Sequence, residues 1–376
     1  MTEPLSLFIL AGEPSGDRIG AALVGGLRER AELRLTGVGG TELMGQGIKP
    51  LFPMSDLSVM GYADVLKRLP KLFWRLGQVG RAILSQQPDV VVLIDSQVFS
   101  ATLARRLRAK GYRGKIVLYV APSVWAWKPE RAPALRPLFD EVLSVLPFET
   151  TVMQRLGGPP TTYVGHPALQ RLPFRLALPE RGPLLLLPGS RLGEIDRTLP
   201  MMRAVAAGLV GHPRVSDLVL PTPHALHQRM TAAVADWTAR PEVVSDEGGR
   251  NRAFGTAVAA VAVSGTVTLE LALAGVPMVT TYVGDTGQAK RFAKYKVKFV
   301  GLPNIILDRA VMPELLFTVP DADRLTAATQ TLLDDRTASA DQVEDFAAMR
   351  ELMEKGAPEA PLVNPVDRVL AVAGRP

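Results

Sequence analysis

The chain has 376 residues, of which 47% are hydrophobic and 21% charged, and its formal net charge is +6. A chain of this length exceeds what one hydrophobic core usually serves, so two domains are expected. The sequence contains no cysteine, which excludes disulfides and thiolate metal sites. There is no charged leader before a long apolar run, and no uncharged apolar stretch of about 18 residues. We therefore expect neither a signal peptide nor a membrane-spanning helix.

Positive charge is concentrated in one part of the chain. Residues 101–137 contain nine lysines and arginines and a single acid, Glu130. Such a segment attracts anions in general. Nucleic acid is not expected as a partner, because no recognised binding module is present and the basic residues lie on ordinary α/β helices. An anionic lipid or a phosphorylated substrate fits the charge equally well.

Short apolar runs alternate with amphipathic helical stretches from the N-terminus onward. In the first half, strands are predicted at residues 5–10, 34–38, 90–94, 116–120, 141–145 and 162–164. In the second half, they are predicted at residues 184–187, 218–220, 242–244, 257–263 and 277–281. Continuous Val, Leu and Ile runs separated by helices indicate parallel sheets covered on both faces. The predicted fold is α/β, with two Rossmann-like parallel-sheet lobes facing a central cleft.

The same pattern predicts the domain boundaries. Residues 1–168 form the first lobe and residues 182–337 the second. Residues 165–182 link them, because prolines and glycines lie near the ends of this stretch and its periodicity is weak. Residues 338–376 form a tail of helix, Pro-rich loop and apolar segment. We expect this tail to pack back on the first lobe.

The strand at residues 184–187 runs directly into Pro188, Gly189, Ser190 and Arg191. A helix is predicted from residue 190 onward. Backbone N–H groups and the positive dipole end at a helix start attract anions. The Arg191 guanidinium adds a planar cation suited to a phosphate group. The junction is therefore a candidate phosphate site.

A second junction of this type follows the apolar strand at residues 257–263. Ser264, Gly265 and Thr266 supply hydroxyl and backbone donors at a helix start, and Glu270 lies one turn further on. A carboxylate there could accept two ribose hydroxyls. The alternative interpretation is an ordinary helix cap. Beside the Arg191 junction, the combination favours a nucleotide site.

Acidic residues stand at the corresponding strand ends of the first half. Glu13 and Asp17 follow the first strand, and Asp95 ends the strand at residues 90–94. Ligands bind at the carboxyl ends of parallel strands, and burial there would raise the pKa of Asp95 and suit it to general-base work. Capping of the next helix is the alternative for Asp95 and for Asp17.

Two further features suggest contact with a lipid or a sugar. Trp125 and Trp127 stand two residues apart in a loop bounded by prolines, where they either staple the loop or bind a sugar, an acyl chain or the bilayer. Residues 65–83 form an amphipathic helix with a basic face. Such a helix either lies on an anionic membrane or faces the core with a solvated basic back. The G-x-G-x-x-G pattern is absent, so a nicotinamide cofactor is not expected.

With these motifs the chain resembles the lipid-A-disaccharide synthase family of GT-B glycosyltransferases. The motifs that carry the resemblance run nearly from end to end, at residues 11–17, 59–61, 119–127, 146–149, 165–167, 187–194, 264–270 and 302–304. The resemblance implies transfer of 2,3-diacylglucosamine from UDP to the 6-hydroxyl of 2,3-diacylglucosamine 1-phosphate, with inversion and without a metal or other cofactor. It also implies a cytoplasmic enzyme peripheral to the inner face of the cell membrane, bound to an anionic surface, and it leaves room for a homodimer.

The resemblance assigns roles to individual residues. Asp95 matches the family's essential aspartate and would be the general base. The residues implied for UDP binding are Gly189, Ser190, Arg191, Ser264, Gly265, Thr266, Glu270 and Asn304. The residues implied for the acceptor side are Glu13, Ser15, Asp17, Met60, Ser123, Trp125 and Trp127.

The chain departs from the family at three places. The family usually continues its aspartate as Asp-x-Pro-Asp-Phe-Asn, whereas residues 95–100 here are Asp-Ser-Gln-Val-Phe-Ser. Phe317 and Gln170 stand where Gln and Asp are common. Two other hypotheses therefore accompany the first. One is a UDP-sugar epimerase of the same fold, and the other is a nucleotide-sugar or lipid-binding protein that has lost turnover.

Overall fold

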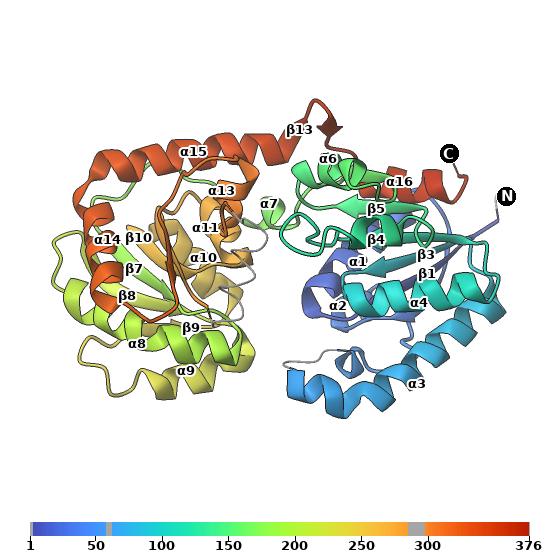
Figure 1. Ribbon diagram of the computed structural model, residues 1–376, viewed down its shortest axis with the longest axis horizontal. Helices are drawn as coiled ribbons and strands as arrows, with labels where there is room; N and C mark the ends of the chain where they lie inside the picture. The colour runs from blue at the N-terminus through green and yellow to red at the C-terminus, as the bar shows by residue number, and fades with distance from the viewer. Residues whose placement is uncertain (1–2, 58–61, 285–297, 376) are drawn as a thin grey trace. The chain divides into compact units, whose positions relative to one another are not determined.

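The computed structural model describes residues 3–57, 62–284 and 298–375 and divides the chain into two compact units. Unit 1 comprises Met1–Pro167 and Lys355–Pro376, and unit 2 comprises Ala168–Glu354. Each unit is built on its own six-stranded sheet with helices on its faces, which confirms the predicted α/β class (Figure 1). The boundary near the C-terminus falls later than expected, because residues 338–354 belong to unit 2.

The sheet of unit 1 is parallel throughout, with the order β2-β1-β3-β4-β5-β6. The order reverses between β1 and β3, so the loops after these strands separate at a topological switch point, where α/β sheets bind ligands. The strands are β1 (Leu5–Ala11), β2 (Leu33–Val38), β3 (Val90–Ile94), β4 (Lys115–Tyr119), β5 (Glu141–Ser144) and β6 (Thr161–Tyr163).

Helices cover both faces of this sheet. Phe8, Leu10 and Leu93 pack on one face in a core shared with α3 (Tyr62–Gln86) and α4 (Gln97–Ala109). The alternate residues Ile9 and Ile94 face Gly20 of α1 on the other side, as a strand period of two requires. The remaining helices before the linker are α1 (Pro14–Arg28), α2 (Thr41–Gly45), the 3-10 turn η1 (Met54–Asp56), α5 (Arg131–Leu135) and α6 (Phe148–Arg155).

The sheet of unit 2 is also parallel, with the order β12-β11-β10-β7-β8-β9. Its switch point lies between β7 and β10, where Leu187 pairs with Ala262. The strands are β7 (Gly182–Leu187), β8 (Val215–Pro221), β9 (Glu242–Val244), β10 (Ala259–Val263), β11 (Met278–Val283) and β12 (Glu314–Phe317). All eleven predicted strands are present. The twelfth, β12, was missed because it is a short strand at the sheet edge, and three of its four residues are partly or fully exposed.

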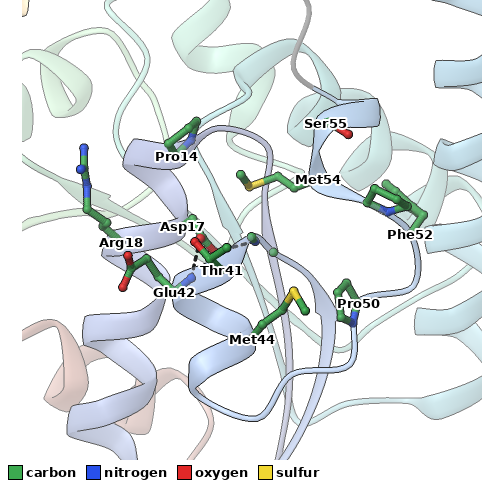
Figure 2. Close-up of a pocket in the computed structure, with 13 residues that line it drawn as sticks. Pro14, Asp17, Arg18, Thr41, Glu42, Met44, Pro50, Phe52, Met54 and Ser55 are labelled. Carbon is green, nitrogen blue, oxygen red and sulfur yellow. Dashed lines mark hydrogen bonds between the residues drawn. The ribbon is translucent and has the colours of Figure 1, made fainter. Parts of the chain in front are cut away.

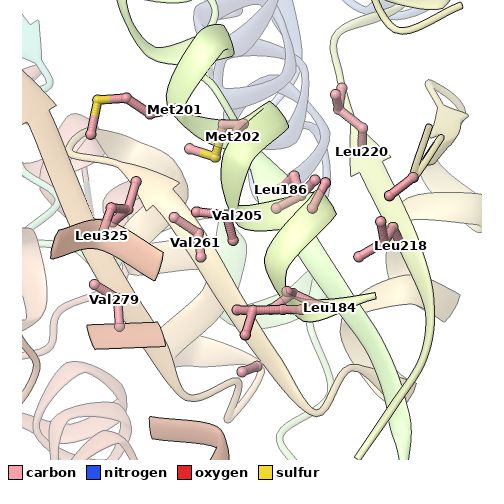
Figure 3. Packing of buried hydrophobic residues seen from close by; sticks show 14 of the residues in the cluster. Leu184, Leu186, Met201, Met202, Val205, Leu218, Leu220, Val261, Val279 and Leu325 are labelled. Carbon is pink, nitrogen blue, oxygen red and sulfur yellow. The ribbon is translucent and has the colours of Figure 1, made fainter. Parts of the chain in front are cut away.

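One face of this sheet carries a hydrophobic cluster of unit 2. Leu184 and Leu186 of β7 pack with Met202 and Val205 of α8 and with Leu325 of α14 (Figure 3). Helices α10 and α11 contact the sheet at β7, β10 and β11. The helices of this unit are α7 (Ala168–Arg171), α8 (Leu192–Leu209), η2 (His224–Leu226), α9 (His227–Ala233), α10 (Glu247–Thr256), α11 (Thr266–Leu273), α13 (Leu302–Ile306), α14 (Ala322–Asp334) and α15 (Arg336–Lys355).

The C-terminal segment packs within unit 1. It forms a small hairpin of β13 (Gly356–Ala357) and β14 (Ala360–Pro361), then α16 (Pro365–Val372), which contacts α1. Arg368 of α16 makes two bonds of 2.8 Å to the carboxylate of Glu141, which is buried in β5. This bidentate pair compensates a charge that would otherwise be buried alone.

The substitution Arg368→Ala should lower the free energy of unfolding of unit 1 by about 3 kcal/mol, because it leaves Glu141 buried without its cation. Urea unfolding followed by a probe in unit 1 measures the change. The control is Arg30→Ala, which removes a pair to Asp367 whose two side chains are half exposed. That pair should contribute less than about 1 kcal/mol. Equal effects of both substitutions would contradict the role of Glu141 burial.

Candidate functional site

The loop after β7 has a backbone that only glycine accepts without strain. Gly189 has a φ of +103°, and a Cβ there would lie 3.1 Å from Oε2 and 3.3 Å from Cβ of Glu194. The chain can therefore turn sharply from the strand into α8 and bring the helix N-terminus to the carboxyl edge of the sheet. Ser190 lies exposed at this turn.

Arg191 is the N-cap of α8 and presents a cation at the helix start. Its backbone is extended, its side chain makes no capping bond, and that side chain is 83% exposed. The buried Glu194 carboxylate holds the guanidinium from one side, with 2.7 Å between Nη1 and Oε1. The dipole of an 18-residue helix and this oriented guanidinium both favour a bound anion at the loop.

The loop after β10 lies beside the first, because β7 and β10 are hydrogen-bonded neighbours. Gly265 is the N-cap of α11, and both Gly265 and Thr266 are exposed. Ser264 is oriented differently, because its hydroxyl donates to the carbonyl of Val300 at 2.7 Å. The two loops together offer two helix N-termini, hydroxyls and one arginine at the switch point of unit 2.

Glu270 lies between two arginines that the sequence pattern did not single out. Its Oε2 is 3.4 Å from Nη1 of Arg250 on α10, and its Oε1 is 3.6 Å from Nη2 of Arg171 on α7. Both arginines also approach Glu247, at 3.9 and 3.6 Å. A ribose that binds Glu270 would therefore share the carboxylate with these guanidinium groups. Arg250 and Arg171 lie 20 and 99 positions before Glu270 in the sequence. A local sequence motif therefore could not have predicted these contacts.

Asn304 supports its loop rather than presenting its side chain to a ligand, which differs from the expected UDP contact. The residue is 1% exposed. Its Nδ2 donates to Met312 O and to Glu314 Oε1, and its Oδ1 accepts from the amides of Val311 and Met312. These four bonds use the full hydrogen-bonding capacity of the amide.

Asp95 lies at the end of β3 on a strained backbone. Asp95 and Ser96 have φ values of +53° and +43°, and Val120, at the end of the neighbouring β4, has +78°. Such values are uncommon outside glycine, are outliers for a β-branched residue, and gather at functional sites. The Asp95 amide donates to Tyr119 O at 2.9 Å, which ties the two strand ends together. Burial raises the pKa of the Asp95 carboxyl, as predicted.

Asp17 is a structural cap in this fold, the alternative considered for it from the sequence. The side chain is buried, and its oxygens accept from the amides of Gly40 and Glu42 at 2.7 and 3.0 Å (Figure 2). They also accept from the amide of Leu43 at 3.2 Å. Asp17 therefore fixes the start of α2 from its position on α1. Glu13 and Ser15 stay exposed at the N-terminus of α1.

The two tryptophans of the loop after β4 have different surroundings. Trp125 donates from Nε1 to Oε1 of Glu149 at 3.2 Å and meets the Phe148 ring edge-on, with 5.4 Å between centroids. Trp125 thus staples the loop. Trp127 is exposed, with the cations of Lys128 and Arg131 within 4.4 and 5.0 Å of its ring. Ser123 is exposed in the same loop, and Met60 lies outside the described residues.

Helix α3 packs on unit 1 along one side and exposes aromatic rings on another. Leu76, Val79 and Ile83 are buried in the core, whereas Phe73 and Trp74 are 52% and 56% exposed. One face of the helix therefore packs on the core, and its outer face carries two aromatic rings as well as charged residues. The side chains of residues 62–68, including Lys67 and Arg68, lie outside the described part.

Two features are absent from residues 3–57, 62–284 and 298–375. Their helices include none long and apolar enough to cross a membrane. Their His, Cys, Asp and Glu side chains include no group of three placed to hold a metal ion.

Comparisons with known proteins show the family of the chain. The family model described as lipid-A-disaccharide synthetase matches residues 7–361. The lipid-A-disaccharide synthase of Nitrobacter hamburgensis is 41% identical over 361 residues, covering 93% of this chain and 91% of that protein. The synthase of Bradyrhizobium diazoefficiens is 39% identical over 376 residues, covering 97% and 96%.

Solved structures share the fold at low identity. The glycosyltransferase of kitacinnamycin matches with a TM-score of 0.62 at 15% identity, covering 99% of this chain and 100% of that one. A UDP-N-acetylglucosamine 2-epimerase, itself a putative assignment, from Listeria monocytogenes matches with 0.58 at 15% identity, covering 96% and 100%. The fold alone therefore does not separate transferases from epimerases, but the sequence relationship does. The chain belongs to the lipid-A-disaccharide synthase family and is a glycosyltransferase of the GT-B fold.

Glu149 gives the loop of Trp125 a measurable pH signature. Burial raises the pKa of its carboxyl to about 8, from an ordinary value of 4.5. The folded chain thus keeps a proton that the unfolded chain releases, so stability should fall as pH rises from about 4.5 to about 8 and then level off. The loss should be on the order of a few kcal/mol.

The substitution Glu149→Gln mimics the protonated acid and should remove this dependence. Urea unfolding of both proteins at several pH values gives the difference curve, in which other titrating groups cancel. A flat difference curve between pH 4.5 and 8 would rule out a buried neutral Glu149.

Proposed function

We propose that this member of the lipid-A-disaccharide synthase family moves a 2,3-diacylglucosamine unit from UDP to the 6-hydroxyl of 2,3-diacylglucosamine 1-phosphate. The products are the β-1,6-linked disaccharide 1-phosphate and UDP. The observation that carries the proposal is Asp95, a partly buried carboxyl on a strained turn at the switch point of unit 1. The full-length relationship to synthases supports this choice of substrates.

Unit 2 would bind the UDP part of the donor. The diphosphate would lie at the N-terminus of α8, against Gly189, Ser190 and the guanidinium of Arg191. Gly265 and Thr266 would add donors from the neighbouring loop, and Glu270 would contact the ribose. As the bond to the sugar breaks, negative charge grows on the diphosphate. The helix start and Arg191 would stabilise that charge where it develops.

Unit 1 would activate the acceptor through Asp95. The carboxylate takes the proton of the 6-hydroxyl while that oxygen forms its bond to the anomeric carbon of the donor sugar. The bond from this carbon to the UDP oxygen breaks, and UDP leaves with the electron pair. One attack from the opposite face inverts the anomeric centre. A pKa raised by burial makes Asp95 a stronger base than an exposed aspartate.

Two substitutions should separate binding from chemistry. Asp95→Asn should lower kcat at least about a hundredfold, because the amide cannot take the proton, and should leave the Kd for UDP unchanged. Arg191→Ala should raise the Kd for UDP about tenfold, because a charge-assisted contact to phosphate is lost. Calorimetry measures UDP binding, and mass spectrometry follows UDP and disaccharide from the two diacylglucosamine substrates.

The same assay distinguishes the competing hypotheses. An epimerase would convert a soluble UDP-sugar without forming disaccharide, and a binding protein would hold UDP without turnover. Intact UDP binding with no disaccharide would therefore refute the transferase. Loss of UDP binding in Asp95→Asn would refute the role of Asp95 as a base.

We also propose that the protein works at the inner face of the cell membrane, where its lipid substrates lie. The exposed rings of Phe73 and Trp74 on α3 would enter the interface, and nearby basic residues would attract anionic lipids. Arg106 of α4 supports this interpretation, because its guanidinium lies 5.3 Å from the Phe73 ring and joins charge to the apolar patch.

The substitution Phe73→Ser should reduce partitioning onto vesicles of anionic phospholipid about tenfold, because an apolar ring no longer leaves water on binding. Flotation of the protein with the vesicles measures this. Leu176→Ser is the matched control, since Leu176 is 72% exposed but lies in unit 2. Equal partitioning of both variants and the unmodified protein would exclude α3 from the membrane contact.

A further inference from the structure

Unit 1 contains a hollow of about 550 Å³. Of the candidate site residues named above, Asp17 lines it. The hollow lies among the start of α1, the loop from β2 to α2, and the segment that leads into η1 (Figure 2). Its volume is in the range of sites that hold small molecules. The lining residues are Pro14, Asp17, Arg18, Gly39, Gly40, Thr41, Glu42, Met44, Pro50, Phe52, Pro53, Met54 and Ser55.

The chemistry of the lining suits an apolar chain. Most of the large side chains are methionine, proline or phenylalanine, and Met44 and Met54 can adapt their shape to a flexible ligand. The buried carboxylate in the lining, Asp17, already accepts three backbone N–H bonds and therefore does not require a polar ligand. The charged residues Arg18 and Glu42 are exposed.

One wall of the hollow is bound to helix α3. Asp56 of η1 forms ion pairs with Lys71 and Arg75 of that helix. The Arg75 guanidinium lies 4.4 Å from the ring of Phe52 and 4.2 Å from the ring of Trp74. Phe52 lines the hollow, and Trp74 is on the exposed face of α3. The wall of the hollow is therefore continuous with the aromatic surface proposed to meet the membrane.

The hollow is also linked to the strand end that carries Asp95. Gly12, at the end of β1, leaves no room for a side chain. A Cβ there would lie 2.2 Å from Ser96 Oγ and 3.5 Å from Leu57 Cβ. Ser96 follows the candidate base, and Leu57 follows the η1 turn of the wall. The hollow thus lies in the same unit as the group proposed to activate the acceptor, and Gly12 packs between Ser96, which follows that group, and Leu57, which follows the wall.

From these contacts we infer that the hollow holds an acyl chain of the acceptor, 2,3-diacylglucosamine 1-phosphate. This inference rests on the proposed function and adds a specificity determinant to it. The acceptor sugar would lie toward Asp95, and one of its chains would pack against Met44, Phe52 and Met54. The membrane-bound lipid would reach the hollow along α3.

The inference predicts how acceptor use depends on chain length. Each added methylene should lower the KM for the acceptor about fourfold until the hollow is full, and further methylenes should have little effect. Met44→Trp should shorten the length at which this plateau begins, because the indole fills part of the space. The KM ratio of long-chain to short-chain acceptor should rise about tenfold. Met44→Ala should move the plateau to longer chains.

Controls separate this inference from the proposed function. Met44 is 53% exposed, so the substitutions should not prevent folding, and Leu176→Trp in unit 2 is the matched control that should keep the unmodified ratio. Direct binding of acceptors of different chain length, measured by calorimetry with short, water-soluble members of the series, does not depend on turnover. If transfer fails but binding still follows Met44, the inference stands and the proposed reaction falls. If Met44→Trp and Met44→Ala leave the chain-length dependence of both KM and binding unchanged, the inference is overturned.

Discussion

The pairing of β1 with β3 and of β7 with β10 is the constraint on which both candidate sites depend. In each sheet these neighbours are distant in sequence, because the chain finishes one side of the sheet before crossing to the other. The loops after such strands lead to opposite sides of the sheet. Side chains at the carboxyl ends of these two strands are therefore open to a ligand. Arg191 and Thr266 in unit 2, and Asp95 in unit 1, all follow strands of these pairs.

The loops at these edges depend on unusual local backbone. Gly189 allows the turn into α8, and the left-handed Asp95, Ser96 and Val120 form the ends of β3 and β4. Each non-glycine residue of this kind costs about 1–3 kcal/mol, so the surrounding packing must over-determine it. Buried carboxyl groups fix other loops of unit 1. Asp17 fixes α2 and Glu149 fixes Trp125, each by hydrogen bonds that leave the carboxyl unavailable for other work.

The sequence predicted the features that are periodic or local. Eleven strands, the α/β class and the parallel sheets follow from apolar runs, and Arg191 and Asp95 follow from where those runs end. Features that join distant residues were not predictable. The arginines around Glu270 and the bonds around Asn304 arise from packing between elements far apart in sequence. Asp17 was ambiguous, because a carboxylate near a strand end serves equally well as a cap or as a ligand group.

The residues after Asp95 form its turn although they depart from the pattern that the resemblance implies. Residues 97, 98 and 100 differ from the family's usual pattern, yet the turn that presents Asp95 is formed. Ser100, at the position of the usual Asn, is buried and donates its hydroxyl to Asp95 O at 2.9 Å. Gln97 directs its amide to Ala121 O at 3.4 Å, in the loop that carries the tryptophans.

Val98 stands where the pattern implied by the resemblance has an Asp, and it is 71% exposed. Its exposure means that the fold does not require an apolar residue there. Burial is the first cause of the raised pKa of the Asp95 carboxyl in this chain. The turn that carries Asp95 is thus held by the hydrogen bond from Ser100 and by the bond from the Asp95 amide to Tyr119 O, without the polar residues of the usual pattern.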